Sequence, residues 1–340
     1  MISIAVLGEG YLFLIGKAIL LLIVIPAFSM LIGYSFLLKM MSHMQDRLGP
    51  MEAGPHGIFQ LLADGLKFLQ KEDLMPNGSD RFIFKAAPIV MLVSTFLLYV
   101  VIPIGPHMVL ENLHTGIFYV LGVSSISVIA ILMAGWASSN QYSLLGALRA
   151  GGQLIAYEIP LVLSVVGVII ESGTLSLQGI VKAQANGNLF GLPIGNPYLI
   201  SQFIGFFIFL ISAQAELAQT PFDMPLAETE IVAGYMTEYS GFRFLLFYLS
   251  ETATAFALSA IASTLFLGGW AVPFIHGTLA QVIGPFVLLA KTMLIAFLIF
   301  WFRFSLPRFR EDQLQAFAWK FLIPLGLVNI LITAIFKVAL

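Results

Sequence analysis

The chain has 340 residues, of which 59% are hydrophobic and only 10% are charged, and its mean hydropathy is +0.96. A soluble globule of this composition could not cover its surface with polar groups, so the sequence predicts an integral membrane protein. The formal net charge of −2 provides no basic field for nucleic acid. The absence of cysteine excludes disulfides and thiolate ligation of an iron–sulfur cluster by this chain.

The apolar residues form eight runs of membrane-spanning length, at about 20 residues per crossing. We therefore expect an all-α polytopic membrane bundle, a single domain over 1–340. Its predicted spans are about 11–38, 82–102, 116–138, 151–171, 199–215, 242–270, 280–302 and 321–339. The first run is too long for a signal-peptide core and no small-residue cleavage site follows it, so we interpret it as a retained span.

Four predicted loops, 39–81, 139–150, 216–241 and 303–320, fall on one side of such a bundle. Together with the adjoining span ends they hold twelve of the sixteen lysines and arginines. The positive-inside rule places these loops on the cytoplasmic side, and both termini on the outer side.

The first of these loops contains an amphipathic stretch at 57–71. Gln60, Asp64, Lys67 and Lys71 recur at helical spacing, with leucines largely on the opposite side. We predict a helix that lies in the membrane interface. Two interpretations of it stay open: a peripheral helix with an Asp64–Lys67 ion pair, or a helix that lines a ligand site.

The third loop, 216–241, places five carboxylates directly between two apolar runs: Glu216, Asp223, Glu228, Glu230 and Glu238. Acidic groups at the edge of lipid are costly unless they are solvated, paired or protonated, so these are functional candidates. A solvated loop is one alternative. For Asp223 a second alternative is helix-start chemistry, because Pro225 follows it closely.

Three charged residues fall inside predicted spans. Glu158 lies two residues before Pro160 in the fourth span, Glu251 in the sixth and Lys291 in the seventh. Each costs roughly 3 kcal/mol at mid-membrane on insertion scales, so together they indicate a hydrated interior path. The alternative is a structural Glu–Lys pair that locks two helices together.

An ordered set of motifs carries a family resemblance. They are Asp46–Pro50, Ala63–Lys67, Leu144–Ala150, Tyr157–Pro160, Pro221–Pro225, Ala227–Gly234, Thr237–Gly241 and Leu306–Arg310. Over nearly the whole chain they resemble the H subunit of proton-pumping NADH:quinone oxidoreductase, respiratory complex I.

The resemblance implies a subunit of a respiratory-chain translocase that is not catalytic alone. It would form much of the chamber for its substrate, quinone, and bind no metal or flavin itself. Its implied partners are the iron–sulfur and quinone-site subunits of the hydrophilic arm, the other membrane-arm subunits and the lipid bilayer, and nucleic acid is not among them. The implied location is the cell inner (plasma) membrane.

The resemblance also implies site residues. Matching positions place Glu216, Glu158 and Glu251 on a route of proton or charge coupling, to which we add Lys291 because of its place inside a span. The implied quinone-chamber residues are Arg47, Asp64, Lys67, Glu72, Phe222, Asp223, Glu228, Glu230, Glu238 and Arg303.

This sequence departs from the family pattern at several positions that bear on the polarity of the chamber. Many members have Glu-Arg where this chain has Leu37-Leu38, Asn-Arg where it has Ala218-Gln219, Glu where it has Leu226, and Arg where it has Glu52. Three alternative functions stay open: a related subunit of a membrane-bound hydrogenase or other-donor complex, a stand-alone secondary transporter, or a purely structural anchor. The charged inside loops, and the lack of an evident inverted repeat, disfavour a transporter.

Overall fold

The computed structural model describes residue 16 and residues 19–106, 108–187, 195–272 and 278–339. Helices are the only regular secondary structure in these ranges. They are η1 (Leu20–Val24), α2 (Ile25–Met44), η2 (Pro55–Gly57), α3 (Gln60–Gln70), α4 (Arg81–Leu98), α5 (Gly116–Ala137), α6 (Gln141–Ser172), α7 (Leu177–Ala185), α8 (Tyr198–Ser201), α9 (Phe203–Glu216), α10 (Glu228–Ile231), η3 (Gly234–Met236), α11 (Gly241–Phe266), α12 (Thr278–Ser305), α13 (Glu311–Phe317), η4 (Ala318–Leu322) and α14 (Ile323–Ala339).

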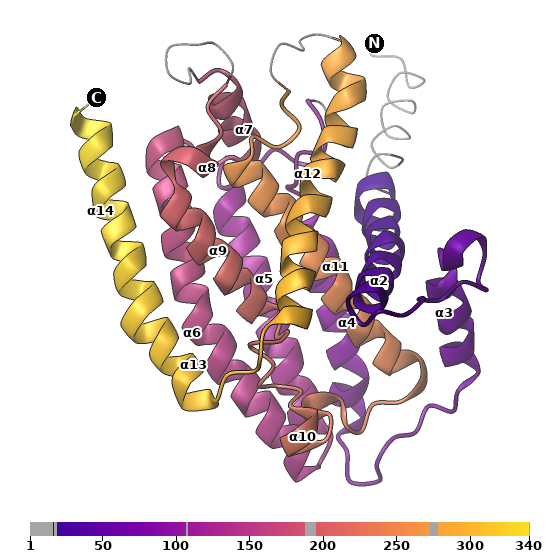
Figure 1. Ribbon diagram of the computed structural model, residues 1–340. Coiled ribbons are helices and arrows are strands. Elements are labelled where there is room, and N and C mark those ends of the chain that lie inside the picture. The colour runs from indigo at the N-terminus through magenta and orange to yellow at the C-terminus, as the bar shows by residue number, and fades with distance from the viewer. Residues whose placement is uncertain (1–15, 17–18, 107, 188–194, 273–277, 340) are drawn as a thin grey trace, which may run out of the picture.

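Seven helical segments among the described residues are long and apolar enough to cross a membrane. They are α2, α4, α5, α6, α11, α12 and the continuous run from α13 to α14, while α9 is apolar but shorter. The predicted all-α membrane bundle is therefore confirmed. The helices stand side by side, and α14 ends at the same end of the bundle at which α2 begins (Figure 1).

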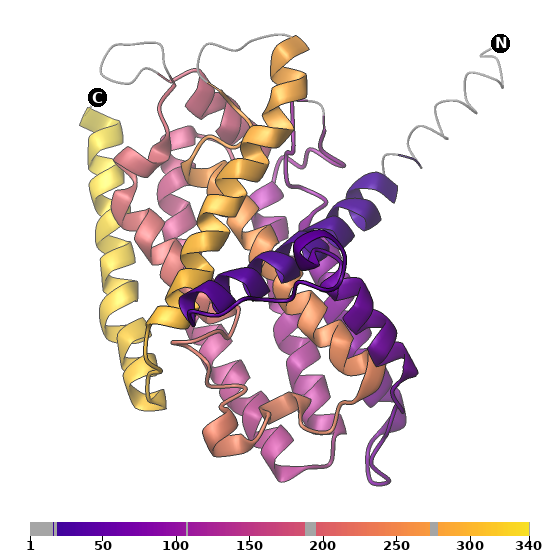
Figure 2. The same ribbon diagram turned by 45° about the vertical axis from the view of Figure 1, so that its right-hand side comes forward.

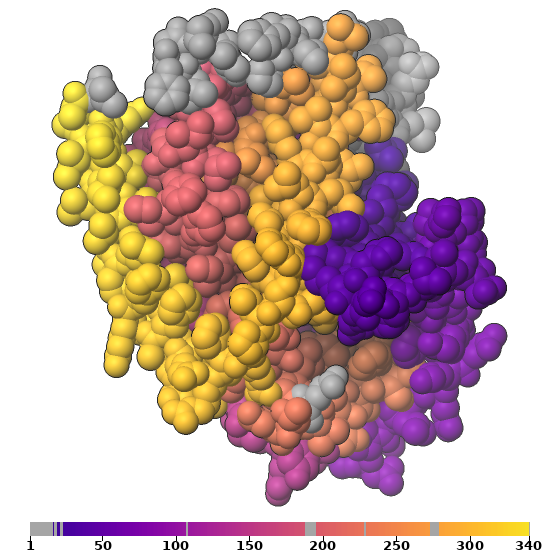
Figure 3. All heavy atoms as spheres, viewed as in Figure 1, coloured from indigo at the N-terminus to yellow at the C-terminus, as the bar shows by residue number. Residues whose placement is uncertain are grey.

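Helix α11 occupies the centre of the bundle. It packs against α2, α3, α4, α9 and α12, and its side chains are the most buried of any long helix. Helix α2 is steeply inclined relative to the others (Figure 2). On one face of the molecule, α14, α9 and α12 lie in a row and the α2–α3 region projects at the side (Figure 3).

Local sequence determines where several helices begin and end. Asp80 accepts hydrogen bonds from the N–H groups of the first turn of α4, and Asn140 does the same for α6. Gly173 ends α6 in the left-handed conformation (φ 69°), with its N–H bonded to the carbonyl of Ile169. These caps fix the lengths of the helices that carry the interior charges.

Two predicted spans differ in detail from the helices. Helix α2 continues to Met44, beyond the predicted end at 38, and the start of that predicted run lies outside the described residues. The predicted run 199–215 is divided at Gln202, whose backbone leaves the helical region (φ −109°, ψ 37°). The buried Gln202 side chain donates to Glu171 and to Thr333 and accepts from Asn329, so the polar group at this break is satisfied.

The segment after α9 folds back against the bundle instead of extending into solvent. Gly234 (φ 53°) lies so close to Pro225 that a Cβ atom there would stand 1.7 Å from the Pro225 carbonyl oxygen. A Cβ on Gly146 of α6 would stand 2.7 Å from the Gly234 Cα atom. These close backbone approaches hold the acidic segment against α6.

Candidate functional site

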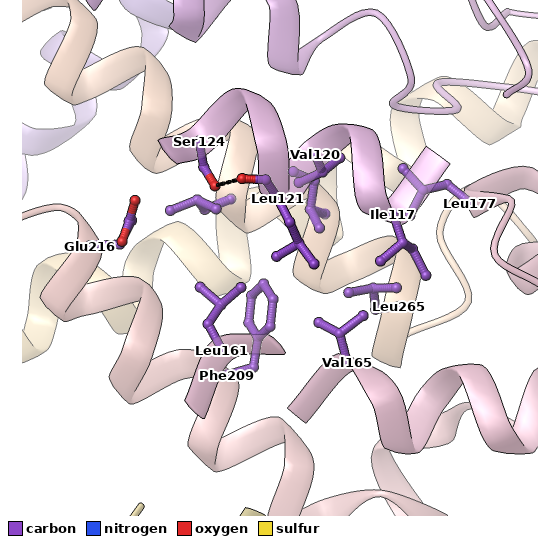
Figure 4. Close-up of a pocket in the computed structure, with 12 residues that line it drawn as sticks. Ile117, Val120, Leu121, Ser124, Leu161, Val165, Leu177, Phe209, Glu216 and Leu265 are labelled. Atoms are coloured by element: carbon purple, nitrogen blue, oxygen red, sulfur yellow. Dashed lines mark hydrogen bonds between the residues drawn. The ribbon is translucent and has the colours of Figure 1, made fainter. Parts of the chain in front are cut away.

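Glu216, the last residue of α9, lies where two small interior cavities meet. One cavity, of about 20 Å³, is otherwise lined mainly by apolar side chains such as Leu161 and Phe209, and Glu216 stands at one end of it (Figure 4). The second, of about 30 Å³, also contains Glu251 and hydroxyl-bearing residues of α4 and α5. Cavities of this size admit about one or two water molecules.

Glu158 faces the same region from α6. Its carboxylate accepts a hydrogen bond from Ser125 of α5, and Glu158 and Glu216 lie close enough to repel each other when both are charged. Ser124, the neighbour of Ser125, lines both cavities with Glu216. The two acids and the serines thus form one polar group inside an apolar bundle.

Glu251 of α11 is held by two partners. Its Oε1 accepts from Arg303 of α12 at 3.1 Å and from Gln219 at 2.9 Å. The Glu251 side chain is only 11% exposed and that of Arg303 22%. The predicted interior charge at Glu251 is therefore compensated by an arginine from the neighbouring helix.

Lys291 of α12 serves a different part of the fold. Its Nζ donates to the carbonyl oxygens of Leu267, Gly269 and Ala271, at 2.7, 2.8 and 3.1 Å. Leu267 lies 16 residues beyond Glu251, so the ammonium group lies about 24 Å farther along the α11 axis. The structural Glu–Lys pair considered above is wrong: Lys291 caps the end of α11, while Glu251 pairs with Arg303.

The amphipathic helix α3 is attached to the bundle through Asp64. Asp64 Oδ2 accepts from the Tyr34 hydroxyl of α2 at 2.6 Å, and Oδ1 from Lys67 at 3.0 Å. Burial alone would raise the pKa of the Asp64 carboxyl, but the hydrogen bonds from Tyr34 and Lys67 outweigh it and lower the pKa below its usual value. Asp64 is thus held as a carboxylate at the α2–α3 contact.

Glu230 joins three parts of the chain at the surface. It pairs with Arg149 of α6 at 2.6 Å and with Arg308 at 3.1 Å, and Arg149 also reaches Glu311 of α13 at 3.5 Å. The hydrogen bond from Arg149 lowers the pKa of Glu230. Because Glu230 is half exposed, this cluster is a surface network, separate from the interior acids.

The other acids of this segment divide in the same way. Glu238 accepts from the amide of Asn140. Asp223 lies five residues before α10, which begins at Glu228 with Ala227 as its N-cap, so the helix-start alternative for Asp223 is wrong. The side chain of Glu228 lies outside the described residues. Of the five predicted carboxylates, Glu216 alone lines the interior cavities described above.

The remaining predicted chamber residues lie apart from the cavities. Phe222 is buried against Tyr157, with ring centroids 5.2 Å apart, and also contacts Phe309. Arg47 is exposed and bonds to Gln45, and Glu72 is exposed in the segment after α3. The two interior cavities are too small for a quinone ring, which therefore requires a surface shared with another chain.

Sequence reasoning missed the side chains that orient the acids. Ser125, Tyr34 and Tyr248 carry no charge and occupy apolar runs, so neither composition nor the search for buried charge selects them. The run of hydroxyls Ser124, Ser125 and Ser127 in an otherwise apolar helix was the available signal.

No group of His, Asp or Glu that could hold a metal ion occurs within the described ranges. The arrangement offers carboxylates that can take up and release protons, next to space for water. It is suited to proton or charge transfer, with any redox centre supplied by another chain.

Comparisons with known proteins agree with these features. The pattern of the NADH dehydrogenase family matches residues 17–334. The H subunit of NADH-quinone oxidoreductase from Dehalococcoides mccartyi is 48% identical over 296 residues, which is 87% of this chain and 79% of that protein. The H subunits from Brevibacillus brevis (44%, covering 95% of this chain and 93% of the relative) and Koribacter versatilis (the one numbered 2; 40%, 97% and 99%) are similarly close. The chain, with its bundle of apolar helices and interior acids, therefore belongs to the NADH dehydrogenase family, among relatives named as the H subunit of NADH-quinone oxidoreductase.

Proposed function

We propose that this chain is the membrane subunit of a proton-translocating NADH:quinone oxidoreductase that forms part of the quinone chamber and couples quinone reduction to proton movement. The names of its relatives support the complex, and the interior acids support the coupling role. Reduction of a quinone to a quinol takes up two electrons and two protons. The electrons would come from a partner, because this chain has no cysteine for a cluster.

The observation that carries the coupling role is the position of Glu216 on both interior cavities. Glu251 lies on one of these cavities, and Glu158 is within electrostatic range of Glu216. A change of charge at a quinone beside this group would alter which of the acids holds a proton, because like charges in a poorly solvated site cannot all be ionised at low cost. Water in the cavities, with the Ser124 and Ser125 hydroxyls, would carry the proton between the acids.

The chamber itself is proposed to form between α3, the segment that follows α9, and the iron–sulfur and quinone-site subunits of the hydrophilic arm. The exposed network around Glu230 supports a protein partner on this side, since it fixes a charged surface. The concentration of lysine and arginine in the inside loops supports a multi-pass orientation in the plasma membrane with both termini outside.

The test uses Glu216→Gln in the assembled complex, with quinone reduction and proton uptake measured in the same vesicles. Glu52→Gln, at an exposed side chain, is the matched control. We expect Glu216→Gln to lower proton uptake per quinone reduced by at least several-fold, while the control behaves as the unchanged protein. Full coupling in Glu216→Gln would remove Glu216 from the path.

A further inference from the structure

A tyrosine pair lies between helix α3 and the buried Glu251–Arg303 pair. The Tyr34 hydroxyl of α2 donates to Asp64 of α3 at 2.6 Å, across 30 residues of sequence. The Tyr34 ring meets the ring of Tyr248 on α11 edge to face, with centroids 5.7 Å apart and planes at 82°. Three different helices are thus joined at one contact.

Tyr248 continues this contact toward the interior. It lies three residues before Glu251 on α11, so both side chains project from neighbouring positions on the same side of that helix. Tyr248 interacts electrostatically with Glu251, with Arg303 and with Asp64. The charge on α3 and the charges on α11 and α12 therefore act on one side chain.

The surroundings of the pair exclude water. Met30, Leu61 and Ala253 are buried, and Leu31 and Leu249 pack against them, which forms an apolar cluster between α2, α3 and α11 that includes Tyr34. Polar interactions strengthen where water is excluded, and a hydrogen bond to a carboxylate is among the stronger kinds. The Tyr34–Asp64 bond is thus a specific attachment of α3.

We propose that Tyr34 and Tyr248 are positioning residues for quinone: they hold Asp64 of α3 and the Glu251–Arg303 pair as one electrostatic unit, and so fix α3 as a wall of the quinone path. This inference rests on the proposed function. The two leucines at 37 and 38 leave the inner end of α2 without the charges common there in the family, and the Tyr34 hydroxyl supplies a polar attachment to α3 one turn earlier.

The positioning role predicts a specific kinetic pattern in the assembled complex. Tyr34→Phe keeps the ring but removes the donor, so α3 loses its attachment while the acids that move protons are unchanged. We expect the KM for a membrane-borne quinone to rise by about tenfold, from the loss of a hydrogen bond to a charged group, with kcat within about twofold. Tyr142→Phe, at an exposed tyrosine, is the control and should leave both constants unchanged.

Two further measurements separate positioning from simple structural support. If the pair acts as a unit, Tyr34→Phe combined with Asp64→Asn is no worse in KM than Asp64→Asn alone. Hydrogen exchange of the amides of residues 60–70 should be faster in Tyr34→Phe, which reports the attachment of α3 without using catalysis. A structural role alone would lower the amount of assembled complex and leave KM unchanged, and that result would overturn the inference.

The failure of this inference can be told apart from the failure of the proposed function. If the unchanged complex reduces quinone and responds to Glu216→Gln, but Tyr34→Phe behaves like Tyr142→Phe, the positioning role is wrong and the proposed function stands. If the unchanged complex reduces no quinone, both are wrong.

Discussion

The Glu251–Arg303 pair allows a quantitative prediction. Removing one partner of a buried ion pair costs about 3–5 kcal/mol, and the 11% and 22% exposure of these side chains places the pair below that range. An upper bound comes from protonation: neutralising an ordinary glutamate at pH 7 costs about 3.7 kcal/mol, from about 2.7 pH units at 1.36 kcal/mol each. We therefore expect Arg303→Gln to destabilise the protein by about 2–3 kcal/mol.

A double-mutant cycle measures the interaction directly. Glu251→Gln keeps an oxygen that can accept from Gln219, so we expect a cost of about 1–2 kcal/mol. In the double variant no unpaired charge is left, and its cost should fall below the sum of the single variants by about 2 kcal/mol. The assay is denaturant titration of each variant in mixed micelles, followed by helical circular dichroism. Costs that simply add would show that the two side chains do not interact, and would refute this reasoning.

Three further predictions concern other parts of the fold. Glu230→Gln should cost no more than about 1 kcal/mol, because the pairs are half exposed. Since its pKa is lowered in the folded chain, the contribution of Glu230 is present above the ordinary glutamate range and is lost as pH falls through the lowered value, so thermal unfolding of Glu230→Gln and the unchanged chain should converge in acid. Lys291→Met leaves three carbonyl oxygens without their donor, and we expect faster hydrogen exchange at the end of α11; unchanged exchange would contradict the capping role. Gly234→Ala should prevent the acidic segment from folding against α6 and abolish assembly on native gels, whereas Gly122→Ala, with no atom within 4 Å, should assemble normally.

The sequence was sufficient to predict the all-α membrane bundle, because its apolar runs are long and continuous. The interior acids could also be selected, since a charge within an apolar run stands out by composition. Their partners could not be predicted. Glu251 pairs with Arg303, which lies 52 residues away, and such a contact depends on how α11 and α12 pack.

The acidic segment illustrates a second limit. Its five carboxylates are equivalent by composition, yet Glu216 lines interior cavities while Glu230 belongs to a surface network. The difference arises from the chain reversal around Gly234, which depends on a close contact with Pro225. Likewise, the division of the fifth apolar run at Gln202 follows from side-chain bonds to distant helices, which hydropathy does not encode.

The most direct measurement of the central claim is the infrared difference spectrum between the oxidised and reduced complex. If Glu216 changes its protonation when quinone is reduced, the spectrum of the unchanged complex contains a carboxylic-acid C=O signal that is absent from Glu216→Gln and present in Glu52→Gln. An identical carboxyl signal in all three proteins would show that Glu216 keeps its protonation state throughout, and would contradict the account.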